Sequence, residues 1–253
     1  DEIGHSYNEL LGNIQRLLEE IKEQERELRT SELNMLISQL NPHFLYNTLD
    51  TIYMLARINK EETTMRMIQA LSRYLRLSLS KGNDIVTVED ELENVKSYME
   101  IQQIRNKDLF SYQVDCRVDA AHTTVLKLVL QPLVENAVKY GFRDIFEGGQ
   151  IRITVWKEEE ELYLEVYNNG TPMEADMVQK INGMNKLPLG EMKNCFPDKR
   201  HGYGVVNILT RLRLKYGDGA AFYCRAQEDG TTCTIKIPRG DGQEAYEQEQ
   251  IQI

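Results

Sequence analysis

His43 is the first residue in this chain whose chemistry needs an explanation, because it directly follows a proline in a stretch with helical patterns on both flanks. The stretch, QLNPHFLYNTLD, runs from Gln39 to Asp50. A neutral imidazole is a nucleophile near pH 7, since its ordinary pKa is about 6.5. A single histidine on a helix is more often structural, so a reactive role for His43 needs support from the rest of the sequence.

A second group of polar side chains lies downstream, in LVLQPLVENAVKYGF from Leu128 to Phe142. This stretch predicts a helix with apolar residues on one face and Glu135, Asn136 and Lys139 on the other. Asn136 and Lys139 are three residues apart and so share a helical face. An amide oxygen can ligate Mg²⁺, and an ammonium can contact a phosphate. The pattern therefore indicates a site for a metal-bound phosphate group.

A glycine pair marks a third candidate site. Gly202 and Gly204 directly precede a predicted helix in RHGYGVVNILTRLRLKYG, and backbone N–H groups before a helix form a ready anion site. Alone this pair is weak support, because glycine pairs commonly serve loops. Alternating patterns predict strands at 151–156, 162–170, 221–227 and 231–238, and the second of these runs into a glycine turn.

The N-terminal stretch predicts a long helix ahead of the histidine box. Its seam residues are spaced alternately by four and three, which is typical of a parallel coiled coil between two copies of the chain. The alternative is a single amphipathic helix that lies on a domain. The seam consists of Leu10, Ile14, Leu17, Ile21, Gln24, Leu28, Ser31 and Met35.

Pro42 leaves two interpretations open, because proline either starts or kinks a helix. In one, Asn41 is the N-cap of a fresh helix that begins at Pro42. In the other, a single helix is kinked there and the carbonyl of residue 38 is released. A turn at 59–61 then leads to a second periodic run at 65–79, so we expect an antiparallel hairpin. Two such hairpins would make a four-helix bundle.

The charge of the chain argues against a nucleic-acid partner. Its 253 residues carry a net charge of −10, whereas a phosphate-binding surface needs clustered Lys and Arg. The one compact basic group, Arg211, Arg213 and Lys215, alternates with leucines and is typical of a solvated helix face.

Composition argues against several other classes of protein. His5, His122 and His201 add no second ligand at metal spacing, which argues against zinc, and the four scattered cysteines favour free thiols in the cytosol. No apolar run approaches the ~20 residues that span a bilayer, and no signal peptide is present. The chain begins at Asp1, so we expect an excised piece whose membrane anchor lies upstream.

Three segments together resemble one family. QLNPHFLYNTLD, LQPLVENAVKYG and GYGVVNILTRL resemble the phosphoacceptor box, the N-box and the G-box of sensor histidine kinases of the LytS/YesM type, in the family's order. The opening DEIGHSYNELLGNI resembles, more weakly, the second half of a HAMP linker.

The resemblance implies an α+β fold in four parts. Residues 1–33 would be a HAMP remnant and coiled-coil helix, and 34–83 a dimerising phosphotransfer hairpin that forms a four-helix bundle. Residues 84–240 would be an α/β sandwich ATPase domain of the Bergerat type, shared with DNA gyrase and the heat-shock chaperone ATPases. Residues 241–253 would be a polar tail. It also implies a homodimer in the cytoplasm below a bacterial membrane, with a response regulator receiver domain as partner.

The resemblance gives each candidate residue a role. His43 would accept the γ-phosphoryl group of ATP, and Glu135 would orient or deprotonate its imidazole. Asn47, one turn after His43, would position a water for dephosphorylation of a partner. The nucleotide contacts would be Asn136 for Mg²⁺, Lys139 for phosphate, Tyr140 beside the nucleotide, Asn168 and Gly170 at adenine, and Gly202 and Gly204 in the phosphate-covering lid.

Two positions depart from the commonest histidine kinase pattern. Phe44 follows the acceptor where many kinases have an acidic residue, although the resembled type also lacks it. The usual adenine-binding aspartate is replaced by Asn168, in the sequence Asn168, Asn169, Gly170. The alternative for Asn168 is a residue on a surface turn. Two other functions therefore stand beside an active kinase, namely a pseudokinase relay without chemistry and a free-standing ATPase.

Overall fold

The computed structural model describes residues 42–79, 84–196 and 202–238. These residues belong to two units that divide between Asn59 and Lys60, and each unit is described by itself. The predicted coiled coil at 1–33 and the polar tail at 241–253 lie outside the described residues.

The described part of the first unit is helix α2, Pro42–Ile58, which carries His43 in its first turn. The Asn59 N–H and side-chain amide both donate to the carbonyl of Leu55, at 3.1 and 3.0 Å, and close the helix at its C-terminus. Helix α3, Glu62–Leu79, begins after the turn, so the predicted pair of helices with a short connection is confirmed. The residues that would separate a new helix from a kinked one precede Pro42 and lie outside the described ranges.

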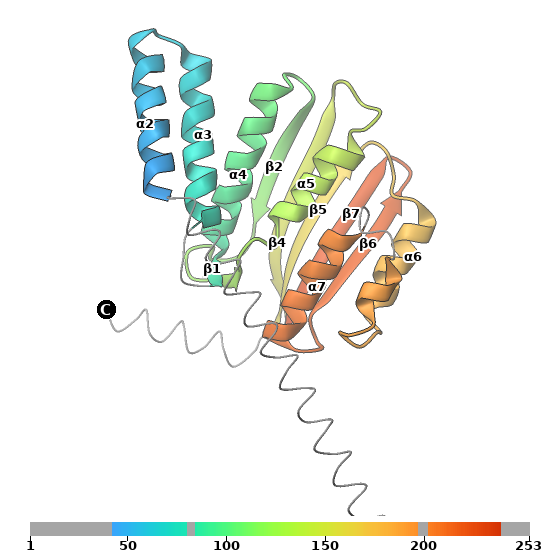
Figure 1. Cartoon of the computed structure of the whole chain (residues 1–253). Coiled ribbons are helices and arrows are strands. Elements are labelled where there is room, and N and C mark those ends of the chain that lie inside the picture. The colour runs from blue at the N-terminus through green and yellow to red at the C-terminus, as the bar shows by residue number, and fades with distance from the viewer. Residues whose placement is uncertain (1–41, 80–83, 197–201, 239–253) are drawn as a thin grey trace, which may run out of the picture. The chain divides into compact units, whose positions relative to one another are not determined.

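A five-stranded sheet forms the frame of the second unit, with strand order β2-β4-β5-β7-β6 (Figure 1). β2 pairs with β4 in parallel, and the other neighbours pair antiparallel. The four predicted strands are confirmed as β4, β5, β6 and β7. The strands are β2 Phe110–Cys116, β4 Gly149–Glu158, β5 Glu161–Asn169, β6 Ala221–Gln227 and β7 Gly230–Pro238.

Helices α4, α5 and α7 lie along one face of this sheet (Figure 1). The helix predicted before Gly217 is confirmed as α7, whereas α4 and α6 were not predicted. A short antiparallel pair, β1 with β3, lies beside them. The remaining elements are β1 Ile85–Thr87, α4 Val88–Arg105, β3 Thr124–Leu126, α5 Gln131–Asn136, the π-helix η1 Ala137–Gly141, α6 Ala175–Met184, the 3₁₀-helix η2 Met192–Cys195 and α7 Tyr203–Tyr216.

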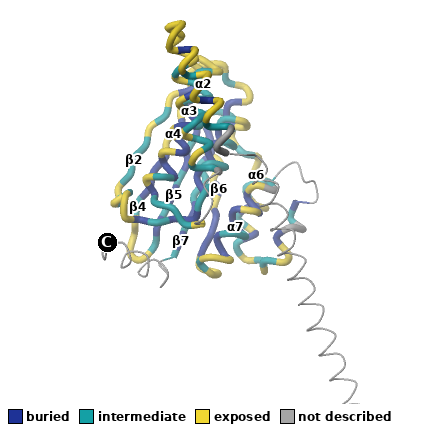
Figure 2. The backbone as a smooth tube through the Cα atoms, turned by 60° about the vertical axis from the view of Figure 1, so that its left-hand side comes forward, coloured by how far each residue is buried: buried dark blue, intermediate teal, exposed yellow. Residues whose placement is uncertain are grey.

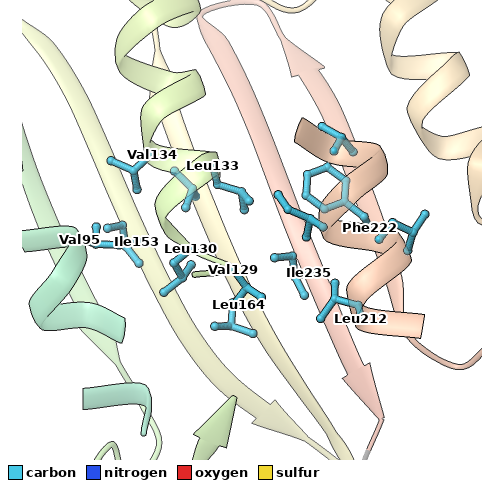
Figure 3. Close-up of a cluster of buried hydrophobic side chains, with 14 of the residues drawn as sticks. Val95, Val129, Leu130, Leu133, Val134, Ile153, Leu164, Leu212, Phe222 and Ile235 are labelled. Atoms are coloured by element: carbon cyan, nitrogen blue, oxygen red, sulfur yellow. The ribbon is translucent and has the colours of Figure 1, made fainter. Parts of the chain in front are cut away.

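The hydrophobic core lies between the sheet and these helices. Every second residue of β5 is buried, starting at Leu162, so one face of the strand is turned to the core. Figure 3 shows Leu164 and Ile235 of the sheet beneath Leu130 of the loop before α5 and Leu212 of α7. Full burial of one such side chain stabilises the fold by about 1.5–3 kcal/mol. Buried residues accordingly follow the helix–sheet contact along its length (Figure 2).

Glu91 of α4 fixes the loop that leads into α5. One carboxylate oxygen accepts the N–H of Leu128 at 2.9 Å and the other accepts the N–H of Leu130 at 2.8 Å. Leu128 has a φ of +59°, a left-handed conformation that a bulky residue adopts only when its surroundings hold it there. Glu91 is 2% exposed, and this burial raises its pKa. The buried carboxylate therefore substitutes for missing backbone partners in the loop.

Replacing Glu91 with alanine is expected to destabilise the second unit, because both loop N–H groups would lose their acceptor. A buried donor without a partner costs on the order of 1–3 kcal/mol. Urea unfolding should show a lower midpoint with an unchanged slope. Glu91→Gln keeps one acceptor oxygen, so this variant should lose less stability than the alanine variant. A midpoint that alanine leaves unchanged would show that solvent satisfies these N–H groups.

Glu91 also makes the stability of the folded state depend on pH. Because its folded pKa is raised above the unfolded value, the folded state binds a proton more readily than the unfolded state. Burial of this charge therefore lowers the free energy of unfolding at pH values above the folded pKa. The loss disappears as the pH falls through the folded pKa toward the pKa of the unfolded state.

Candidate functional site

The predicted helix at 128–142 begins later than expected and changes type near its end. α5 starts at Gln131, because the preceding residues belong to the loop held by Glu91. From Ala137 to Gly141 the chain forms a π-helix. π-turns inside helices occur frequently at functional sites. The predicted bounds at the N-terminal side were therefore wrong by three residues, whereas the helical character is confirmed.

The predicted separation of polar and apolar faces is confirmed. Leu133, Val134 and Ala137 are buried against the sheet. Glu135 and Asn136 are half-buried, and Lys139 is exposed. The polar side chains therefore line the accessible side of this helix, where a ligand can reach them.

Tyr140 is 40% exposed, and the Lys139 ammonium lies 5.0 Å from the centroid of its ring. A cation–π contact of this kind at an exposed site contributes about 0.5–1 kcal/mol. The contact holds a positive charge next to an exposed aromatic ring. Phosphate and a planar base are the chemical groups that such a pair can contact.

The end of β5 packs against the end of the π-helix. The Thr171 N–H donates to the Gly141 carbonyl at 2.8 Å, and Gly170 has a φ of +111°. A side chain on Gly141 would overlap the Asn168 amide, and one on Gly170 would overlap the Gly141 carbonyl. Glycine at both positions thus allows the close approach of the two segments. The structure brings Asn168 and Gly170 together with the helix that carries Asn136, Lys139 and Tyr140.

Asn168 is a buried residue, 5% exposed, and its Nδ2 donates to the Asn169 carbonyl at 2.9 Å. The interpretation of Asn168 as a residue on a surface turn is therefore wrong. Asn169 has a different role, since its side chain accepts the Gln150 N–H at 2.6 Å and donates to the Gly148 carbonyl at 3.2 Å. Asn169 ties β5 to the start of β4, and Asn168 faces the packed end of the π-helix.

Replacing Asn168 with aspartate is expected to lower the stability of the nucleotide-free protein and to tighten ATP binding several-fold. The carboxylate loses the bond to the Asn169 carbonyl and is buried, at a cost on the order of 1–3 kcal/mol. An adenine amino group would then supply the missing donor through a charge-assisted bond. Thermal unfolding with and without ATP measures the first effect. Calorimetric titration with ATP and with an inosine analogue that lacks the amino group measures the second. If the variant prefers adenine no more than the parent does, Asn168 does not read the base.

Gly202 and Gly204 stand at the start of α7. Gly202 is the N-cap and has a φ of +80°, and a side chain there would overlap the ring of Phe196. Gly204 has open space where a side chain would stand. Residues 197–201 immediately before them lie outside the described ranges. Among the described residues, no atom from beyond the neighbouring residues and the helix backbone lies within 4 Å of the place where a Gly204 side chain would stand, so an anion has room beside the start of α7.

Arg213 holds the segment that follows α6. Its guanidinium donates to the carbonyls of Leu187 at 2.8 Å, Ala220 at 3.5 Å and Asn185. Arg213 is itself buried, so α7 is fixed to the connection between α6 and η2. The prediction of a solvated helix face is therefore wrong for this residue.

His43 and Asn47 belong to α2 in the first unit. Both lie in the helix, one turn apart, and Asn47 is exposed. The Asn47 carbonyl accepts the Thr51 hydroxyl at 2.8 Å. The side chain of His43 lies outside the described part of the chain, so its role stays a prediction from the sequence.

Among the described residues, no group of three or more His, Cys, Asp or Glu side chains is placed to hold a metal ion. Within the same ranges, no helix has the length and apolar character to cross a bilayer. A groove of about 710 Å³ lies between α6 and β6, with Asn182, Tyr223 and Arg225 among its lining residues. It contains none of the predicted site residues, and we assign it no role.

Two family models match consecutive parts of the chain. The model described as histidine kinase matches residues 31–110, and the model described as histidine kinase-, DNA gyrase B- and HSP90-like ATPase matches residues 121–241. The chain belongs to the histidine kinases. The first match contains His43, and the second contains every predicted nucleotide contact, from Asn136 to Gly204.

Sensor histidine kinases are also among the similar curated proteins. Sensor histidine kinase YesM of Bacillus subtilis is 31% identical over 237 residues, which is 93% of this chain and 38% of YesM. Sensor protein kinase HptS of Staphylococcus aureus is 30% identical over 243 residues, which is 96% of this chain and 45% of HptS. The chain therefore spans less than half the length of these two relatives.

Solved histidine kinase structures are similar at lower identity. The catalytic domain of histidine kinase ThkA is 20% identical with a TM-score of 0.46, and the match covers 63% of this chain and 97% of that domain. The histidine kinase domain of the blue-light activated kinase from Erythrobacter litoralis EL346 is 16% identical with a TM-score of 0.45, covering 87% of this chain and 98% of that one.

Proposed function

We propose that this chain autophosphorylates on His43 with ATP and passes the phosphoryl group to an aspartate of a response regulator. The observation that carries the proposal is the junction of the π-helix with the end of β5. There, a half-buried amide, an exposed ammonium and an exposed aromatic ring lie on a helix that packs against the buried Asn168. These are groups that can bind a Mg-nucleotide, and the histidine kinase model matches residues 31–110, a range that includes His43.

The proposed contacts follow the chemistry of each side chain. Asn168 would accept from the adenine amino group, Tyr140 would contact the base or sugar, and Lys139 would contact phosphate. Gly204 leaves room for a phosphate at the start of α7. The half-buried amide of Asn136 fits Mg²⁺, which prefers oxygen ligands and keeps contacts with substrate phosphates. When bound, the ion would neutralise phosphate charge.

The proposed phosphoryl transfer needs no reactant besides ATP and His43. An imidazole nitrogen of His43 forms a bond to the γ-phosphorus, while the bond from that phosphorus to the bridging oxygen breaks and ADP leaves. Glu135, one residue before Asn136, would orient the imidazole or take its proton. Phosphoryl transfer depends mainly on positioning and charge neutralisation, which the residues of the second unit supply.

The finer parts of the proposal concern assembly. We expect a homodimer through the phosphotransfer hairpins, and we place the chain as the cytoplasmic portion of a membrane sensor, with the membrane reached through a segment outside this sequence. The partner would be a receiver domain whose aspartate accepts the phosphoryl group, with Asn47 positioning a water for the reverse hydrolysis.

Incubation with Mg-ATP labelled at the γ-phosphate tests the proposal. Label on the protein that is lost in acid and survives base supports it, as expected for a phosphoramidate. Free phosphate without protein label would indicate an ATPase. If neither protein label nor free phosphate forms, the chain would be a pseudokinase relay. Asn168, which stands in place of the usual aspartate, favours this alternative.

A further inference from the structure

Helix α3 packs on the nucleotide-binding part of the second unit through α4. Arg66 and Arg73 pair with Glu100 at 3.4 and 2.7 Å. These surface ion pairs contribute little energy, but they show which face of α3 meets α4. The ring of Tyr74 lies on this face, 6.2 Å from the ring of Tyr98 between their centroids. The second helix of the phosphotransfer hairpin thus extends to the part of the chain that carries Glu135.

A side-chain network joins Tyr74 to Glu135 through Gln131. The Gln131 Nε2 donates to the Tyr74 hydroxyl at 2.5 Å and to the Glu135 Oε1 at 2.6 Å. The Gln131 Oε1 accepts from the amide of Asn94 at 3.1 Å. Gln131 is the first residue of α5, and Glu135 follows one turn later.

The direction of these bonds is set by the Glu135 carboxylate, which can only accept. The Gln131 NH₂ group must therefore face Glu135 and Tyr74, which turns the Gln131 oxygen toward the amide of Asn94. Asn94 is 2% exposed on α4. One amide thus holds the tyrosine hydroxyl and the carboxylate at the same time.

The electrostatics agree with this geometry. The pKa of Tyr74 is raised by burial and then by the charge of Glu135. The pKa of Tyr98 is raised to about 12 by the same two causes, burial first. Both phenols therefore stay neutral beside the carboxylate. The network holds only Oε1 of Glu135, and Oε2 takes no part in these bonds.

We propose that Gln131 and Tyr74 are positioning residues that fix the Glu135 carboxylate in one orientation. The position in which α3 packs against α4 and α5 then controls how this carboxylate is aligned for phosphoryl transfer. The inference rests on the proposed function, because it assigns to Glu135 the carboxylate role in the transfer to His43. It adds a path by which α3, the helix that follows the acceptor helix in the chain, adjusts the nucleotide-binding domain. A shift of α3 would remove the Tyr74 hydroxyl from Gln131 and release that amide to rotate.

The test compares Tyr74→Phe and Gln131→Met, which remove the bonding atoms and keep most of the volume. We expect each to slow single-turnover labelling at saturating ATP by roughly tenfold, because misplaced groups lose transfer rate. Calorimetric ATP affinity should stay within twofold, since neither residue is among the proposed nucleotide contacts. Tyr98→Phe removes a neighbouring hydroxyl outside these bonds and should keep the parent rate. Thermal unfolding confirms that each variant is folded.

A second experiment tests whether the two substitutions act through Glu135. In a Glu135→Ala background, the Tyr74 and Gln131 substitutions should slow labelling no further, because residues that act through one group are not additive. Additive losses would show a general structural role and overturn the inference. Parent-like or faster labelling by the two single variants would overturn it as well. A parent chain that acquires no label would instead refute the proposed function, and the inference with it.

Discussion

Replacing His43 with glutamine is expected to abolish acid-labile labelling from γ-labelled ATP, because glutamine offers no nucleophilic ring nitrogen. ATP affinity should not change, since every predicted nucleotide contact lies in the second unit. The loss should exceed the detection range of the assay, which makes it the largest of the expected effects. Autoradiography after acid and base treatment measures it.

His122→Gln is the matched control for this experiment. His122 is exposed and pairs with Asp119 at 3.0 Å on the surface of the second unit. Its replacement should leave labelling at the parent level. Acid-labile label that persists on the His43 variant would move the acceptor to another histidine and remove the central claim.

Replacing Asn136 with alanine is expected to remove Mg-dependent phosphotransfer, because the ion would lose its ligand from the protein. The side chain is half-buried on the accessible side of α5, next to the buried Ala137, so truncation should not disturb the core. A rate loss of roughly 100-fold or more is expected for a group that orients the transferred phosphate. Single-turnover labelling across a range of Mg²⁺ concentrations measures the loss.

Asn136→Asp is the informative companion, because a carboxylate oxygen also ligates Mg²⁺. This variant should retain labelling, with a changed Mg²⁺ dependence. Transfer rates within a factor of two of the parent for Asn136→Ala would show that α5 does not hold the metal.

The strands and the polar helix face could be predicted from sequence because their periodicity is strong. β5 alternates buried and accessible residues along its length, and β6 was predicted with the bounds that it has. The start of α5 was wrong because the loop before it is as apolar as the helix, and only Glu91 in α4 reveals where the helix begins. A contact between residues so far apart in sequence has no local signature.

Helix α4 was missed although the sequence carries a signal for it. The Thr87 hydroxyl accepts the Asp90 N–H at 3.0 Å, so TVED is a helix N-cap that the sequence displays. The helix then buries polar residues such as Asn94 and Ser97 beside apolar ones, which obscures its helical period.

The candidate site shows the same division. Asn136 and Lys139 could be predicted from their spacing on one helix, and Tyr140 from the family resemblance. The burial of Asn168 could not, because it depends on the close approach of Gly141. The bond from Gln131 to Tyr74 joins α5 to a helix on the far side of α4, and nothing in the local sequence of either residue predicts it.

The pairing of β5 with β7 has a consequence for how this domain tolerates change over evolution. Asn169 at the end of β5 lies opposite Gly230 at the start of β7, so the chain leaves the sheet after β5, forms the edge strand β6 and returns next to the point where it left. Each doubling of the length of a flexible loop adds only about 0.6 kcal/mol to the entropic cost of closing it. Insertions and deletions in this excursion, outside α6, α7 and β6, therefore leave the ladder intact. Homologous chains can vary in length here and adapt the proposed phosphate-covering segment without changing the sheet.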